Sequence, residues 1–199
     1  MSINVCNDRS MASITSLPSG VSGSSLVLIS EQTASSSSTI SFTSGIDSTY
    51  KEYIFKFINL HPSEASRPQF NLSADGGSNY NVTKTTTFFA SFNDEAGSSG
   101  AISYSTGGDL AQGTGVQRLG GDTDADNDTA MSGTLHLFDP SSTTFVKHFI
   151  SRTNQVSTAY SQDCFMAGYA NTTSAVNAIQ FSQDSGTIQS GTIKMYGVV

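Results

Sequence analysis

Charged residues are scarce in this 199-residue chain. It has nine Lys and Arg against sixteen Asp and Glu, which gives a formal net charge of −7 at pH 7. Nine cations spread thinly along the chain form no patch that could neutralise a phosphate backbone, so we expect no nucleic-acid partner. The same shortage argues against anionic membrane surfaces, and no apolar run approaches the ~20 residues of a membrane-spanning helix. We therefore expect no membrane partner either.

Cysteine is nearly missing, and a secretion signal is not indicated. Cys6 and Cys164 are the only two cysteines. A disulfide between them is one interpretation; we favour two thiols in a reducing cytoplasm, because disulfides are rare in such compartments. The first ten residues, MSINVCNDRS, lack the apolar core of a signal peptide, so the sequence does not indicate Sec-type export.

Helix formers such as Leu, Glu, Lys and Arg are also scarce, which excludes a coiled coil or a helical bundle. There is no Trp at all. What the chain does have is 35 Ser, 22 Thr and 18 Gly, together with 36% hydrophobic and 10% aromatic residues. A disordered chain would have fewer aromatic residues and more charge. The composition therefore predicts an ordered all-β protein.

Apolar and polar residues alternate with a period of two in short segments from Leu26 to the end of the chain. They predict roughly nine or ten short strands separated by turn signals such as Asp75-Gly76-Gly77. We expect an antiparallel β-sandwich with a jelly-roll-like topology. Residues 1–25 show no periodicity and end in PSGVSGSS. We therefore expect an extended N-terminal arm at 1–25 and a β-sandwich domain at 26–199.

Two strands carry more apolar surface than one sheet face can bury. The strand at 53–60 has aromatic residues on one face and aliphatic residues (Ile54, Ile58 and Leu60) on the other, and Phe88 and Phe89 are adjacent in a second strand. A strand that is apolar on both faces lies inside a sandwich or where a sheet meets another subunit. The residues that we predict to bind a partner are Tyr53, Phe55, Phe57, Phe88 and Phe89, with Ile3 and Val5 of the arm.

An acidic loop follows Gly120-Gly121, with four aspartates at alternate positions: Asp122, Asp124, Asp126 and Asp128. Carboxylates are the hard oxygen ligands that Ca²⁺ prefers, so one interpretation is a calcium site formed by these four residues. The EF-hand pattern breaks at Asn127 and Gly133, where it would need Gly and Glu. We favour a solvated acidic loop and expect no bound cofactor.

No catalytic motif is present. His61, His136 and His148 lie at no metal-ligand spacing to one another or to a cysteine. His136 should point away from the leucines beside it, and His61 should end a strand. The Gly-x-Ser-x-Gly pattern of a nucleophile elbow does not occur, nor does a phosphate-binding loop. We therefore expect that the protein is not an enzyme.

Carbohydrate binding is an alternative. Sugar sites present aromatic side chains surrounded by Asn, Asp and backbone donors. The candidates here are Tyr80, Tyr104, Tyr160 and Tyr169. Against this hypothesis, the chain lacks Trp, and tyrosines within strands more often fill the interior of a sandwich.

Several segments are more specific than the composition. They are SGIDSTYKEY at 44–53, TTTFF at 85–89, GTLHLF at 133–138, DPSSTTFVKHF at 139–149 and GTIKMYG at 191–197. Over about residues 26–197 the chain resembles a family of virion structural proteins of tailed phages of aquatic bacteria, cyanophages among them. The family has no catalytic motif to carry over. The resemblance implies a β-sandwich on the particle, either decorating the head or attached to the tail or fibres.

The sequence thus predicts a non-enzymatic structural component of a tailed-phage virion, foremost a capsid decoration or cement protein. It would bind the particle surface through its arm and sheet faces. The expected partners are the major capsid protein or other virion proteins, and further copies of the chain in a homotrimer. The expected location is the virion, assembled in the host cytoplasm.

The alternative is a tail- or fibre-associated adsorption module that binds host-surface glycans through the loops between Asp75 and Asp128. A third hypothesis, a glycan hydrolase, has no residues that select it.

Overall fold

The computed structural model describes residues 25–157 and 159–199. This part of the chain forms twelve β-strands and no helix, so the all-β expectation is confirmed and no helix capable of spanning a membrane is found in it. The strands are β1 (Leu26–Thr33), β2 (Thr39–Phe42), β3 (Glu52–Pro62), β4 (Pro68–Ser73), β5 (Lys84–Asp94), β6 (Gly100–Tyr104), β7 (Gln117–Arg118), β8 (Met131–Phe138), β9 (Lys147–Ser157), β10 (Tyr160–Ala170), β11 (Ala178–Gln183) and β12 (Ile188–Val198).

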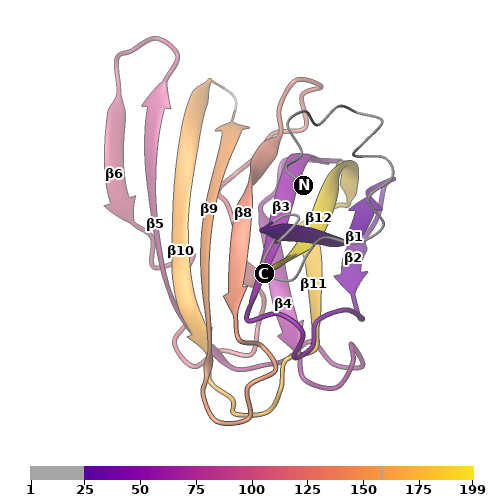
Figure 1. The fold of residues 1–199 in the computed structure, drawn as a ribbon. Coiled ribbons are helices and arrows are strands. Elements are labelled where there is room, and N and C mark those ends of the chain that lie inside the picture. The colour runs from indigo at the N-terminus through magenta and orange to yellow at the C-terminus, as the bar shows by residue number, and fades with distance from the viewer. Residues whose placement is uncertain (1–24, 158) are drawn as a thin grey trace, which may run out of the picture.

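The strands form two sheets, in which all pairs are antiparallel. The larger sheet has eight strands in the order β1-β12-β3-β8-β9-β10-β5-β6, and the smaller has four in the order β2-β11-β4-β7. In Figure 1, β6, β5, β10 and β9 stand on the left, while β2, β11 and β4 lie on the right with β3, β12 and β1. The arrangement confirms the expected antiparallel β-sandwich.

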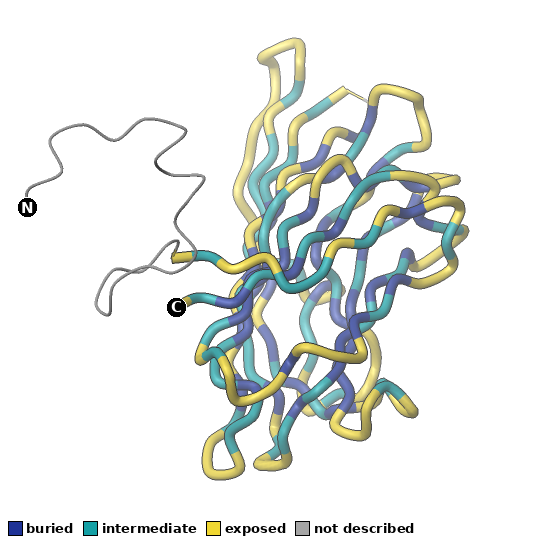
Figure 2. The backbone as a smooth tube through the Cα atoms, turned by 45° about the vertical axis from the view of Figure 1, so that its right-hand side comes forward, coloured by how far each residue is buried: buried dark blue, intermediate teal, exposed yellow. Residues whose placement is uncertain are grey.

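The core lies between the sheets, and several strands alternate more buried and more exposed residues. The pattern is uninterrupted in β9, where every second residue from Lys147 to Ser157 is buried. Figure 2 shows the same alternation as buried and exposed stretches along neighbouring strands. At the centre, the ring of Phe181 in β11 packs against Phe55 and Phe57 of β3, with centroids 5.5 and 5.3 Å apart.

The prediction that the aromatic face of β3 binds a partner is wrong. Tyr53 and Phe55 are 0% exposed and Phe57 is 2% exposed, because the smaller sheet covers this face. Phe88 of β5 is 4% exposed and also points into the interior. These four side chains are core residues and offer no surface to a partner.

A β-bulge in β3 corrects a second expectation. Leu60 was expected on the same face as Ile54 and Ile58, but it is 2% exposed, and the register with β8 shifts between Phe57 and Leu60. Asn59 absorbs the extra residue with a positive φ of 49°. The bulge reverses the alternation, as bulges do, and returns Leu60 to the core.

In the half of the larger sheet formed by β9, β10, β5 and β6, the inner side is covered by a different segment of the chain. Residues 105–130, which include β7, lie against it: the Thr86 hydroxyl donates to Gln117 Oε1 at 2.6 Å, and the Thr153 hydroxyl donates to the Leu119 carbonyl at 2.7 Å. Buried hydroxyls and amides here are paired with one another, as burial requires. The loop therefore covers the inner side of β9, β10 and β5 and leaves their other side open, whereas every residue of β6 is exposed.

The expected arm lies outside the described residues except for Ser25, and so do its candidate contacts Ile3 and Val5. Cys6 lies outside them too. Cys164 is a buried free thiol, and burial raises its pKa.

Candidate binding face

Exposed apolar side chains gather on one surface of the molecule. We call the side of the eight-stranded sheet that is turned away from the smaller sheet the outer face. Of the eleven large hydrophobic residues that are exposed in the described part of the chain, seven lie on it: Leu28, Ile58, Phe89, Ile102, Tyr104, Ile150 and Val156. Ile102 is 69% exposed and Ile150 is 53% exposed. Scattered exposed hydrophobics are ordinary, whereas a group of them on neighbouring strands marks an interaction surface; five of the seven lie on β9, β5 and β6, and Leu28 and Ile58 lie on the other half of the sheet.

A row of stacked side chains crosses the outer face at right angles to the strands. Phe165 of β10 pairs in register with Arg152 of β9 and Phe89 of β5, and Phe89 pairs with Tyr104 of β6. The Phe89 and Phe165 rings are stacked, with centroids 4.8 Å apart and planes 6° apart. The Arg152 guanidinium carbon lies 4.9 Å from the Phe165 centroid. We call this row of four side chains the ridge.

An ion pair fixes one end of the ridge. Arg152 Nε lies 3.1 Å from both carboxylate oxygens of Asp163, and Arg152 Nη2 lies 2.7 Å from Asp163 Oδ2. These hydrogen bonds raise the pKa of Arg152. Two-point pairing orients the guanidinium plane as well as neutralising it. Arg152 therefore presents a fixed, charge-compensated surface beside the aromatic rings.

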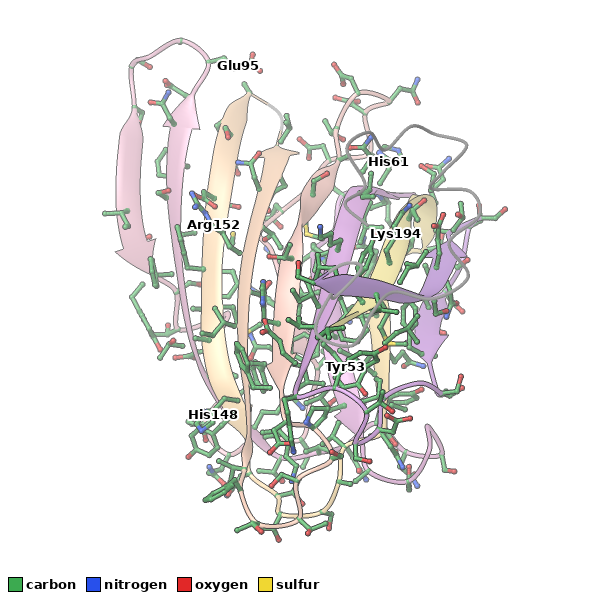
Figure 3. The ribbon with its side chains drawn as sticks, viewed as in Figure 1. Tyr53, His61, Glu95, His148, Arg152 and Lys194 are labelled. Atoms are coloured by element: carbon green, nitrogen blue, oxygen red, sulfur yellow. The ribbon has the colours of Figure 1, made fainter. Side chains whose placement is uncertain are left out.

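A furrow runs beside the ridge. Its floor consists of two short side chains that pair in register, Ala167 of β10 and Thr87 of β5, with Ile150 of β9 next to Ala167. Because taller rows stand on both sides, two adjoining hollows of about 470 and 320 Å³ form over this floor. The far wall is His148 and Tyr169, whose ring centroids are 6.2 Å apart. Figure 3 labels Arg152 and His148, which stand at different heights on the left half of the sheet.

A separate hollow, of about 650 Å³, lies at the end of β3 and is polar. Its lining includes Ser36, Asn59, His61, Asn127, Asp128 and Gln189. Ser36 and Asn59 have positive φ values of 50° and 49°, and backbones held in this region recur at functional sites. His61 Nδ1 lies 2.7 Å from the Thr129 carbonyl, so Nδ1 is the protonated nitrogen and donates to it. Figure 3 places His61 at the upper end of the sheet. We call this cavity the polar hollow.

The acidic loop does not form the calcium site considered above. No three His, Cys, Asp or Glu side chains come together as a metal site within residues 25–157 and 159–199. Asp122 pairs instead with Arg67, Oδ1 to Nε at 2.8 Å. The loop is held by Thr129, whose hydroxyl lies 2.5 Å from the Asp124 carbonyl and 2.9 Å from the Asp126 carbonyl. The four carboxylates are therefore spread along a turn and do not converge.

The histidines behave as their positions in the strands predicted. Leu135 and Leu137 are buried, and His136 points to the outer face, where its Nδ1 lies 2.6 Å from Glu52 Oε1. His61 lies next to the last residue of β3. His148 is exposed beside the furrow.

Two buried lysines were missed, because nothing in a strand pattern distinguishes a lysine that points inward. Lys84 and Lys147 are both 0% exposed. Lys84 Nζ donates to Asn71 Oδ1 at 2.6 Å and to the Val82 carbonyl at 2.7 Å, and burial lowers its pKa to about 8. Lys147 Nζ donates to the Phe145 and Thr172 carbonyls at 3.0 and 3.1 Å, and burial lowers its pKa. Both ammonium groups tie loops to strand ends.

Of the predicted partner-binding residues that the structure describes, Phe89 alone lies on the outer face. Nothing in the sequence had assigned Ile150, Arg152, Phe165 or Ala167 to a site. The alternation in β9 could have indicated that Ile150 and Arg152 face outward, because both lie on the side of the strand opposite to Phe149. The tyrosines considered for sugar binding do not form one platform: Tyr104 and Tyr169 lie on the outer face, Tyr160 packs against Phe92 at 5.8 Å, and Tyr80 lies in the loop after β4.

Comparisons with protein-family models, with curated proteins and with solved structures found no match to this chain.

Proposed function

We propose that this protein is a non-enzymatic structural component of a tailed-phage virion that attaches through the outer face of its larger sheet. The observation that carries the proposal is the gathering of seven exposed large hydrophobic side chains on that face. A sheet face with a stacked aromatic ridge and an apolar furrow is costly to leave in water and is suited to packing against protein. The attachment surface differs from the one predicted from β3, whose aromatic side chains are in the core.

We also infer that the fold is a jelly roll with two inserted hairpins. Without β5–β6 and β9–β10, eight strands remain, and the larger sheet holds the first, eighth, third and sixth of them. The smaller sheet holds the second, seventh, fourth and fifth. This is the order of a ribbon of paired strands wrapped into two sheets, an architecture of capsid and lectin domains. The two hairpins lie side by side and supply most of the ridge and the furrow.

The titratable groups support a role without catalysis. The ammonium groups of Lys84 and Lys147 donate hydrogen bonds to carbonyl and amide oxygens. The thiol of Cys164 is buried with a raised pKa, which makes it a poor nucleophile. Asp75 and Asp94 have lowered pKa values because neighbouring Ser and Asn groups donate to them within turns. These are the contacts of a scaffold and not of a proton-transfer site.

A cryo-EM map of the intact particle tests the proposal. We expect density for this chain at a fixed position on the head or tail, with β9, β10 and β5 against a neighbouring protein chain. A particle without this chain, or one on which the outer face is turned to solvent in every copy, would overturn it. Density on the head with residues 1–25 against a neighbour would support the cement role in particular.

The polar hollow favours the adsorption module as a second candidate. Its amides, hydroxyls and imidazole are the donors and acceptors that neutral sugars use, whereas the ridge presents ring edges and a salt-bridged Arg152. A glycan array probed with the full chain, then repeated with Asn127→Ala, tests this function. Binding that falls at least tenfold in the variant would support it, and an array without hits for the wild type would remove it.

A further inference from the structure

We propose that a second copy of this chain packs on the outer face, with the ridge of each copy in the furrow of the other. The proposal deepens the proposed function, because it names the partner of the attachment surface. Three properties of the face support it: its relief, its charge and its area.

The relief of the face is self-complementary. The ridge at Phe165 and the furrow floor at Ala167 are two residues apart on β10, a distance of about 7 Å along a strand. Each copy therefore carries a projection and a matching depression side by side. When two such faces meet, the Phe165 and Phe89 rings of one copy can enter the hollows over Ala167 and Thr87 of the other. Interdigitation of this kind is how sheets pack face to face at about 10 Å.

The charge of the face permits contact between identical acidic proteins. The chain carries a net charge of −7, yet the outward positions of the eight strands hold three cations and three anions. Arg152 pairs with Asp163, and Lys194 pairs with Glu31 at 3.0 Å. Lys56 lies over the Tyr196 ring, and Glu52 contacts His136. The negative charge thus lies elsewhere, and two outer faces can meet without the like-charge repulsion that other surfaces of this protein would impose.

The area of the face is that of a stable association when the whole sheet takes part. Eight strands at about 4.8 Å spacing, over a length of about seven residues, span about 800 Å² per copy, which is one partner's share of a standard protein–protein interface, and the four strands of the ridge and furrow supply about half of it. The aromatic and aliphatic side chains of the ridge and furrow lie together on β9, β10, β5 and β6, to one side of the centre of the sheet, and such side chains are enriched in the cores of homodimer interfaces. A small glycan would cover only a fraction of this surface.

The test compares the mass of the full chain in solution with that of three variants. Ile150→Asp places a carboxylate beside the furrow at a side chain that is 53% exposed, so the fold should survive it. Val116→Asp is the matched control, because Val116 is 44% exposed in the loop on the opposite side of the sheet. Light scattering after gel filtration gives the mass, sedimentation equilibrium gives the dissociation constant, and circular dichroism checks the fold of each variant.

We expect the wild type and Val116→Asp to associate into dimers or higher oligomers, and Ile150→Asp to raise the dissociation constant at least tenfold. A second variant, Ala167→Arg, fills the furrow from its floor and should have the same effect. A wild type that stays at 20.9 kDa up to about 100 μM would overturn the proposal. Equal association of all four proteins would also overturn it.

The outcomes separate this inference from the proposed function. A chain that is monomeric in solution but occupies the particle through its outer face leaves the proposed function standing and shows that another protein covers the face. A chain that associates through Ile150 but is missing from purified particles supports the inference and overturns the virion role.

Discussion

Phe88 and Phe89 are adjacent in the chain and lie on opposite sides of the larger sheet, 4% and 37% exposed. Phe88 packs in the core, and Phe89 stacks on Phe165 in the ridge. Tyr53 and Ile54 differ in the same way, since Tyr53 points inward and Ile54 points to the outer face, where it pairs in register with His136. At the scale of residues, therefore, one position along a strand decides between a structural role and a binding role.

Tyr53 tests this distinction, because its aromatic ring was expected at an interface. Its hydroxyl accepts from the Asp47 N–H at 2.9 Å and donates to the Asp47 carbonyl at 3.0 Å. Tyr53→Phe removes these bonds and should lower the free energy of unfolding by about 1–3 kcal/mol in a urea titration. Self-association should not change. A variant with wild-type stability and weaker association would contradict the assignment of Tyr53 to the core.

Lys84 gives the stability a dependence on pH. Its pKa falls from 10.5 to about 8 on folding, because burial disfavours the ammonium. Between these values the unfolded chain binds more protons at Lys84 than the folded chain, so this residue makes the free energy of unfolding rise with pH. Over the whole window the contribution is about 3 kcal/mol.

We therefore expect the stability of the wild type relative to Lys84→Met to increase as pH rises from about 8 to 10 in parallel urea titrations. Subtracting the variant cancels the titration of other groups. Lys51→Met, which removes an exposed lysine, is the matched control. A difference between wild type and Lys84→Met that stays flat over this range would show that the Lys84 ammonium is not destabilised by burial.

At the scale of elements, two bulges decide where the polar hollow forms. The register between β3 and β12 shifts on both sides of Ser190, and β3 carries Asn59 with a positive φ. The neighbouring Gly191 has a φ of 110°, and a Cβ there would lie 2.4 Å from the Asn59 carbonyl oxygen. The two strands can therefore approach at the bulge only because residue 191 has no side chain.

Gly191→Ala should lower the free energy of unfolding by about 2 kcal/mol or more, since both the backbone conformation and the close contact penalise a side chain. Gly115→Ala is the control, because nothing lies within 4 Å of a Cβ at that position. Thermal unfolding of both variants measures the effect. Equal melting temperatures for the two variants would mean that the bulge tolerates a side chain and is not constrained by Gly191.

At the scale of the whole molecule, the two sides of the larger sheet differ in burial and in surface chemistry. The inner side is covered by the smaller sheet and by residues 105–130 except at β6, and the outer side carries seven exposed large hydrophobic side chains and balanced charge. The excess negative charge is distributed over the remaining surface. The molecule therefore has one face on which an acidic protein can meet another copy of itself.

This separation predicts the response of self-association to salt. Raising NaCl from about 0.05 to 0.5 M should leave the dissociation constant unchanged or lower it, because salt screens the repulsion between net charges and does not weaken apolar contacts. Sedimentation equilibrium at both salt concentrations checks this. A dissociation constant that rises tenfold with salt would mean that ion pairs hold the copies together and that the apolar face does not.

The amino-acid sequence by itself determined the fold class and the positions of nearly all strands. Period-two alternation and turn residues are local signals, and they predicted roughly nine or ten of the twelve strands in the described residues; β7, with two residues, carries no alternation to find. The interpretation of His136 as facing away from Leu135 and Leu137 followed from the same alternation, and that of His61 as a strand end followed from Pro62 beside it.

Only the tertiary structure decided which side of each strand is covered. Alternation distinguishes two faces of β3 and β5, but pairing between residues far apart in the chain determines which face the smaller sheet covers. For that reason Tyr53, Phe55, Phe57 and Phe88 were assigned to an interface and lie in the core. The ridge and the furrow likewise join residues of two hairpins, β9–β10 and β5–β6, which the long-range pairing of β10 with β5 brings side by side. Their formation depends on the placement of the two hairpins, which no local pattern encodes.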